Sequence, residues 1–155
     1  MTAKLEVGDK VPVFKLKNQD EGETALKDFK GRKLLLYFYP KASTPGCTTQ
    51  SCAVSESLAD LKAAGVDAVG MSPDKPAAQK KFDDKYGLGF PLLCDEDHAV
   101  AEAFGVWGEK SMYGKTYMGI VRSAFLIDEK GVLEGVWYKV SPKDTVPNVR
   151  KLLGV

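Results

Sequence analysis

Leu34-Leu35-Leu36-Tyr37-Phe38-Tyr39 decides the fold, because it is the longest wholly apolar run in the chain. Six residues without a charged side chain are typical of a central strand that is covered on both faces. The run is far shorter than the ~20 apolar residues that a membrane-spanning helix needs. We therefore expect a buried strand at the centre of an α/β fold and no membrane span.

Helix-like and strand-like segments alternate around this run. A helix is expected to begin at Thr44-Pro45 and to end at Gly65, since these residue types favour helix starts and ends. The other expected elements are strands at 10–17, 66–71, 90–94, 123–127 and 132–138, and helices at 77–86, 98–104 and 145–153. A strand–helix–strand order requires a parallel pair, whereas the last two strands form an antiparallel hairpin. The pattern predicts a three-layer α/β fold, a mixed central sheet with helices on both faces.

The composition is that of one ordinary globular domain spanning residues 1–155. Hydrophobic residues make up 44%, which is too apolar for a disordered chain. Twenty-two basic against 21 acidic residues leave a net charge of +1, which argues against a broad nucleic-acid-binding face. The first residues lack the apolar core of a signal peptide, so we expect a cytoplasmic protein. In a reducing compartment, its three cysteines are inert, metal-binding or reactive.

Cys47 occupies the one position that has the makings of a reactive site. Counted from Thr44 as the N-cap, it is the third helical residue, directly after the central strand and its loop. Unpaired N–H groups and the positive end of the helix dipole favour a thiolate there. Pro45 and Gly46 add little bulk, so we expect a small substrate to approach the sulfur. The alternative is a small buried hydrophobic residue, as most free cysteines are.

Cys52 follows five residues later in the same predicted helix. The helical rise and turn put the two Cα atoms roughly 8–9 Å apart, beyond the reach of a disulfide. Either Cys52 only packs against the core, or Cys47 oxidises first and the helix start unwinds so that Cys52 can reach it. Thr48, Thr49 and Ser51 are mediocre helix formers, which makes unwinding easier.

Pro40, Thr44 and Cys47, in the spacing Pro-x3-Thr-x2-Cys, match the active-site motif of peroxiredoxins. Together with Phe38-Tyr39-Pro40-Lys41 and Cys52, this stretch resembles the peroxiredoxin Q branch, also called bacterioferritin comigratory protein. The resemblance continues through nearly the whole chain, at residues 70–74, 90–93, 95–97, 104–110 and 122–128.

This resemblance implies a thioredoxin-like fold and the reduction of hydrogen peroxide and organic hydroperoxides. It implies that Cys47 is the peroxidatic cysteine, that Thr44 and Arg122 hold the peroxide, and that Pro40 shields the pocket. Cys52 matches the resolving cysteine, which forms an intramolecular disulfide with Cys47. The usual reductant of the branch is thioredoxin, sometimes glutaredoxin, and members are often monomers.

The chemistry of the residues agrees with these roles. Attack by a thiolate on an O–O bond moves negative charge onto the leaving oxygen, and Arg122, Thr44 and the Cys47 N–H are donors suited to that charge. Arg122 also favours the thiolate by its positive charge. The alternatives are a surface salt bridge for Arg122 and a plain N-cap for Thr44. No metal or organic cofactor is expected, because sulfur carries the redox change.

Other features leave further alternatives open. Cys94 stands where the branch often has Ser, and we expect a small core residue there, with a second resolving thiol as the alternative. His98 is expected at a helix start, and Trp107 is a candidate wall of the active-site opening. A thioredoxin-type disulfide oxidoreductase would need Cys-x-x-Cys, and Cys47-Thr48-Thr49-Gln50 lacks the second cysteine. A redox-regulated binding module would need a large exposed apolar patch.

Overall fold

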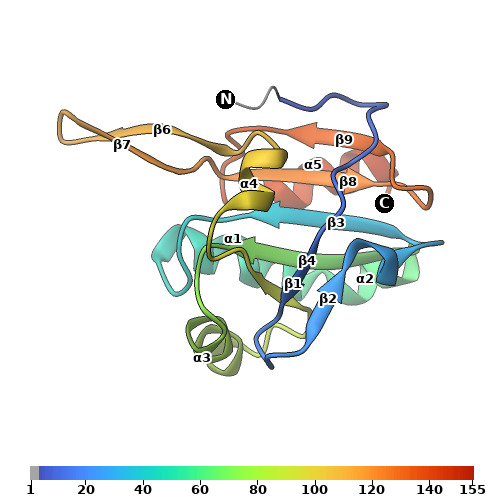
Figure 1. Cartoon of the computed structure of the whole chain (residues 1–155). Helices are drawn as coiled ribbons and strands as arrows, with labels where there is room; N and C mark the ends of the chain where they lie inside the picture. Colours follow the sequence, from blue (N-terminus) through green and yellow to red (C-terminus); the bar gives the residue numbers. More distant parts are fainter. Residues whose placement is uncertain (1–3) are drawn as a thin grey trace.

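A five-stranded mixed sheet forms the centre of the molecule in the computed structural model, which describes residues 4–155 (Figure 1). Its strand order is β5 (Leu92–Cys94), β4 (Val66–Ser72), β3 (Lys33–Phe38), β8 (Ser123–Ile127) and β9 (Leu133–Trp137). The helices are α1 (Pro45–Glu56), α2 (Leu58–Ala63), α3 (Pro76–Tyr86), α4 (Ala99–Ala103), α5 (Thr145–Leu153) and the 3-10 helix η1 (Leu26–Phe29). Two hairpins complete the chain: β1 (Lys15–Lys17) with β2 (Glu23–Ala25), and β6 (Trp107–Met112) with β7 (Lys115–Ile120).

β3 is the middle strand, as the apolar run predicts. It pairs in parallel with β4 and antiparallel with β8, so both of its edges are hydrogen-bonded. Leu35 and Tyr37 belong to one core cluster, and Leu34 and Leu36 belong to the other. Helices α1, α2, α3 and α5 contribute to the first cluster, whereas α4 and η1 contribute to the second. The predicted mixed sheet with helices on both faces is therefore confirmed.

Several element boundaries differ from the sequence prediction. The helix expected from Thr44 to Gly65 is interrupted at Ser57, which separates α1 from α2. The early strand is only Lys15–Lys17, because the chain before it is irregular and the Val13 side chain is 85% exposed. Sequence reasoning also missed the β6–β7 hairpin, which projects away from the sheet in Figure 1. A two-stranded ribbon with little core contact leaves no clear burial pattern in a sequence.

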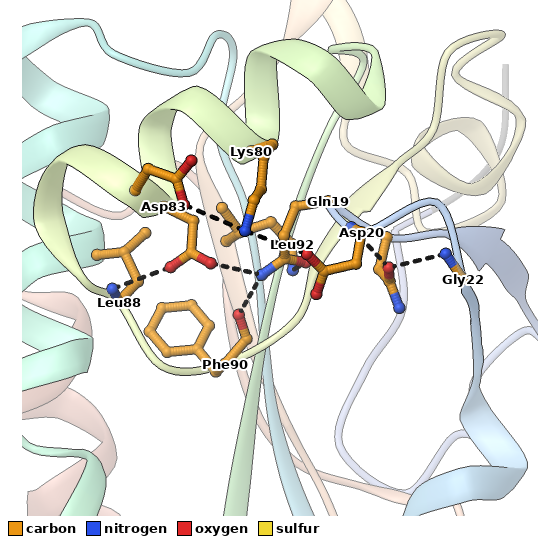
Figure 2. Close-up of polar contacts among 10 residues, drawn as sticks. Gln19, Asp20, Gly22, Lys80, Asp83, Leu88, Phe90 and Leu92 are labelled. Atoms are coloured by element: carbon orange, nitrogen blue, oxygen red, sulfur yellow. Dashed lines mark hydrogen bonds and ion pairs between the residues drawn. The ribbon is translucent and has the colours of Figure 1, made fainter.

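α3 is tied to the β1–β2 turn and to β5 through the buried side chain of Gln19 (Figure 2). Gln19 Nε2 donates to Asp83 Oδ2 at 3.2 Å and to the Phe90 carbonyl at 3.0 Å, and its Oε1 accepts the Leu92 N–H at 2.8 Å. Asp83 also accepts the N–H of Leu88, just beyond the end of α3, at 3.0 Å. These bonds hold the C-terminal end of α3 against the sheet.

Across residues 4–155, every helix is too short or too polar to cross a membrane.

Candidate active site

Cys47 lies in the first turn of α1, at the carboxyl end of β3. Pro45 and Gly46 are the first two helical residues and Cys47 is the third, as predicted. The loop before the helix includes Ser43 in the left-handed region, with φ of 64°. The Cys47 side chain is fully buried among the residues of the first core cluster.

Arg122 reaches Cys47 from the junction of β7 and β8. Because β8 runs antiparallel to β3, Ser123 pairs with Phe38, and the start of β8 lies beside the end of β3. Arg122 Nη2 lies 3.4 Å from Cys47 Sγ, and Arg122 Nη1 donates to Gln50 Oε1 at 2.8 Å. The sheet register thus brings together two residues that are 75 positions apart in the chain.

Gln50 is a member of this cluster that sequence reasoning missed. It lies one turn after Cys47 on α1, fully buried, and its Nε2 donates to Thr145 Oγ1 on α5 at 2.9 Å. Both ends of the amide are hydrogen-bonded, so Gln50 fixes the direction of the Arg122 guanidinium. The sequence does contain a signal that could have identified Gln50: it is a polar residue on the same face of α1 as the buried Cys47 and Val54.

Gly46 corrects the expectation of open space above the sulfur. A Cβ atom at Gly46 would lie 3.0 Å from Arg122 Nη2 and 3.5 Å from Pro142 Cγ. The missing side chain therefore makes room for the guanidinium, and it does not leave a free approach to the sulfur. With Cys47 fully buried, the site is closed around its sulfur.

Thr44 does not cap α1 with its side chain. Its backbone carbonyl accepts the Thr48 N–H at 2.8 Å, but its hydroxyl donates to the Lys41 carbonyl at 2.8 Å. Thr44 is thus the N-cap residue, as predicted, but its hydroxyl makes no capping hydrogen bond. Its oxygen keeps lone pairs that can accept a hydrogen bond.

The loop that contains Pro40, a partly buried residue, is anchored by Asp74. Asp74 Oδ2 accepts the Ala42 N–H at 2.7 Å and the Ser72 hydroxyl at 2.7 Å. Asp74 follows β4, the parallel neighbour of β3, so the same sheet edge supplies both the loop and its anchor. Sequence reasoning quoted the Ser72-Pro73-Asp74 turn without assigning it this role.

All three cysteines are free thiols, and two of them are held in their neutral form. Burial raises the pKa of the partly exposed Cys52, and the Glu56 carboxylate adds to that shift. Burial, with smaller contributions from Glu96 and Asp74, raises the pKa of Cys94 to about 12. Cys47 and Cys52 both lie within the continuous helix α1, so helical geometry keeps their Cα atoms roughly 8–9 Å apart.

His98 and Trp107 lie on the other side of the sheet. Their rings are stacked with centroids 3.8 Å apart, and His98 precedes α4 as predicted. Trp107 packs against the second core cluster, whereas Cys47 belongs to the first. That Trp107 forms a wall of the active-site opening stays a prediction, which this packing does not support. No cluster of His, Cys, Asp and Glu suited to a metal ion occurs in residues 4–155.

Comparison with known proteins assigns this fold and site to a class. Residues 7–136 match the AhpC/TSA family. The chain is 53% identical to peroxiredoxin Bcp of Escherichia coli over 133 residues, which cover 86% of this chain and 85% of that protein. It belongs to the AhpC/TSA family and, within it, to the peroxiredoxins of the Q or bacterioferritin comigratory protein branch.

Solved structures of the branch agree with this assignment. Bacterioferritin comigratory protein of Xanthomonas campestris superposes with a TM-score of 0.86 at 35% identity, covering 94% of this chain and 98% of that one. A variant of peroxiredoxin Q of Xylella fastidiosa superposes with a TM-score of 0.92 at 29% identity, covering 98% and 97%. The protein is thus a peroxidase with a thioredoxin-like fold.

Proposed function

We propose that the peroxidase uses Cys47 as its peroxidatic cysteine and Cys52 as its resolving cysteine, with thioredoxin as the reductant. The observation that carries the first assignment is the Arg122 guanidinium, 3.4 Å from the sulfur of a cysteine in the first turn of a helix. The other two cysteines have raised pKa values, so they are poorer nucleophiles at neutral pH.

In the first step, the Cys47 thiolate attacks one oxygen of the hydroperoxide. The O–O bond breaks, the electron pair leaves on the second oxygen, and this oxygen takes a proton to become water or an alcohol. Arg122 and the N–H groups at the start of α1 stabilise the developing negative charge, and the Thr44 hydroxyl oxygen accepts a hydrogen bond from the peroxide O–H. The O–H oxygen stays on the sulfur as sulfenic acid, and the proton on the leaving oxygen comes from solvent water. Pro40 keeps the loop compact over the pocket. Because Cys47 is buried, the peroxide enters only when neighbouring side chains move aside.

In the second step, the sulfenic acid on Cys47 condenses with the Cys52 thiol. The S–S bond forms, the S–O bond breaks, and the oxygen leaves as water. The helical separation of the two residues forbids this reaction in the folded helix, so the first turns of α1 must unwind. Gly46, Thr48 and Thr49 are poor or mediocre helix formers, which lowers the free energy of that opening.

In the third step, a dithiol reductant exchanges with the Cys47–Cys52 disulfide and restores both thiols. Thioredoxin is the proposed reductant, with glutaredoxin as the second candidate. We further propose that the enzyme is a monomer and acts in the cytoplasm, in keeping with its bacterial relatives of similar length. The X. campestris relative is described by its alkyl peroxide reduction activity, which supports organic hydroperoxides as substrates beside hydrogen peroxide.

Disulfide mapping tests these assignments together. Fully reduced protein is mixed with one equivalent of hydrogen peroxide, quenched within a second and analysed by mass spectrometry. We expect loss of two thiols in a Cys47–Cys52 crosslink, and no reaction in the Cys47→Ser variant. A crosslink to Cys94 would overturn the role of Cys52, and three intact thiols would overturn the role of Cys47.

A further inference from the structure

Lys110 is a partly buried cation that the three proposed steps do not use. It lies on β6, and its side chain runs across the hairpin to β7, where its Cδ atom lies 3.2 Å from the position of a Cβ at Gly119. Its Nζ donates to the Ile120 carbonyl at 2.9 Å. Because Gly119 has no side chain, the Lys110 side chain can lie flat across β7. Its ammonium group then reaches Ile120, which lies two residues before Arg122 in the chain.

The charge of Lys110 has no carboxylate partner among residues 4–155. Burial lowers the pKa of Lys110, and the nearby Arg122 guanidinium lowers it further, whereas the Cys47 thiolate raises it. A partly buried cation that lacks a carboxylate partner and lies beside another cation is unfavourable unless an anion compensates it. In the proposed reaction, the thiolate form of Cys47 supplies that anion, and the attraction is mutual.

We infer that Lys110 is a positioning residue for peroxide reduction: it fixes the β7–β8 junction that delivers Arg122, and it adds a second positive charge near the Cys47 sulfur. This inference rests on the proposed roles of Cys47 and Arg122. Lys110 acts through the Ile120 carbonyl and through its charge, without contact to the reacting atoms. Through Lys110, the β6–β7 hairpin then contributes to the reaction, because it positions the end of β7, which leads directly to Arg122.

The test uses two variants of Lys110 and a matched control on the same hairpin. Lys110→Met keeps the length of the side chain but removes the charge and the hydrogen bond. Lys110→Arg keeps both. Lys115→Gln removes an exposed lysine at the far end of β7. The measurement is the second-order rate constant for loss of the Cys47 thiol on mixing with hydrogen peroxide, together with the melting temperature of each variant.

We expect Lys110→Met to react about tenfold more slowly, the size of effect that one charge exerts across a partly buried site. Lys110→Arg should retain most of the wild-type rate, and Lys115→Gln should match the wild type. Recovery with arginine is the readout that separates a role of the charge and its hydrogen bond from simple packing by the side chain.

Three results would overturn the inference: a Lys110→Met rate equal to the wild type, an equal loss in Lys110→Met and Lys110→Arg, or an equal loss in Lys115→Gln. If Lys110→Met melts much lower than the wild type, the comparison rests on Lys110→Arg and Lys110→Gln at a temperature where both are folded. Failure of wild-type Cys47 to react with peroxide would instead overturn the proposed function itself.

Discussion

Helices α1 and α3 are built alike but are held differently. Each follows a strand of the parallel part of the sheet, each begins with a proline, and each packs on the same core cluster. α3 is anchored near both ends. Gln79 donates to Ser72 Oγ at 2.8 Å and to the Leu93 carbonyl at 3.0 Å, and the clamp between Gln19 and Asp83 holds the other end (Figure 2).

α1 is anchored only in its middle and second half. Ser51 shares a hydrogen bond of 2.7 Å with the Tyr37 hydroxyl, and Ser55 donates to the Leu88 carbonyl at 2.7 Å. Within residues 4–155, a single side-chain hydrogen bond joins the first turn of α1 to other elements, and it is the contact of Arg122 with Cys47. The second half of α1, which carries Cys52, is thus fixed by side-chain hydrogen bonds. The first turn is held through the Cys47 sulfur, by its contact with Arg122.

In the proposed cycle, this difference gives a reason why oxidation of Cys47 leads to unwinding of the first turn of α1. The attraction between a thiolate and a guanidinium is electrostatic, and it is lost when the sulfur becomes a neutral sulfenic acid. In the proposed cycle, oxidation therefore weakens the side-chain bond that joins the first turn of α1 to Arg122, while the anchored half keeps Cys52 in place. α3, without a cysteine and with anchors near both ends, stays folded during the cycle.

Replacing Arg122 should have the largest effect of the changes that distinguish α1 from α3. In Arg122→Met, the first turn of α1 loses its side-chain restraint and the developing charge loses its donor. We expect the rate constant of the first step to fall about 10²–10³-fold, as for the loss of an oxyanion donor. Stopped-flow measurement with hydrogen peroxide checks this. Arg150→Met is the control, since Arg150 pairs with Asp60 at the surface, and equal rates in both variants would refute the role of Arg122.

Replacing Cys52 separates the first step from the second. Cys52→Ser should react with peroxide at the wild-type rate, because Arg122 and the helix start are unchanged. Its turnover with thioredoxin should fall more than about tenfold, because no disulfide forms for the reductant to attack. The sulfenic acid should persist, and excess peroxide should convert it to sulfinic acid. Mass spectrometry of the products decides this, and wild-type turnover in Cys52→Ser would remove the resolving role.

Removing the Gln19 hydrogen bonds that anchor α3 tests whether α3 affects only the stability of the fold and not the reaction. Gln19→Ala removes three hydrogen bonds and leaves the buried Leu92 N–H without its acceptor. We expect a loss of about 1–3 kcal/mol in the free energy of unfolding, measured in urea, with little change in the peroxide rate. The matched control is Asp20→Ala, which removes only an exposed pair with Lys80 and should cost less than about 1 kcal/mol. A large fall in the peroxide rate of Gln19→Ala would show that α3 is coupled to the reaction.

The sequence predicted the positions of β3 and of the start of α1 better than the side-chain contacts that hold these elements together. The apolar run at Leu34 identified β3, and the Thr-Pro-Gly-Cys start placed Cys47 in the third helical position. These signals are local, because strand burial and helix starts depend on neighbouring residues. Gln50, Asp74 and Lys110 were missed because their roles depend on which segments meet in space. The register of β3 with β8 and β4 decides those meetings, and no single segment encodes it.

Two local expectations about the site also differ in part from the structure. Gly46 was expected to leave the sulfur open, but Arg122 from a distant junction fills the space. Thr44 is the N-cap residue of α1 as expected, but its hydroxyl makes no capping bond and donates to the Lys41 carbonyl, in a loop whose next residue, Ala42, is anchored by Asp74. At Gly46 a long-range contact overrode a preference that a short segment expresses alone, whereas at Thr44 a local bond took the hydroxyl proton within a loop that Asp74 holds.

Cys94 gives the smallest expected effect and a direct check on how the three thiols differ. Burial raises its pKa to about 12, so its thiol stays protonated through the neutral range and is a poor nucleophile. Native protein treated with iodoacetamide at pH 7 to 9 should be alkylated at Cys47 first and should remain unlabelled at Cys94. Because the folded-state pKa lies above the ordinary thiol value of 9.0, the unfolded chain loses this proton first, and Cys94 lowers the stability of the fold as pH rises from 9 toward 12. Cys94→Ser should remove that pH-dependent loss and leave the peroxide rate within about twofold of the wild type. Peptide mapping of the label and urea unfolding at pH 7 and 10 test both points, and fast labelling of Cys94 at pH 7 would show an exposed, reactive thiol on a strand that the structure buries.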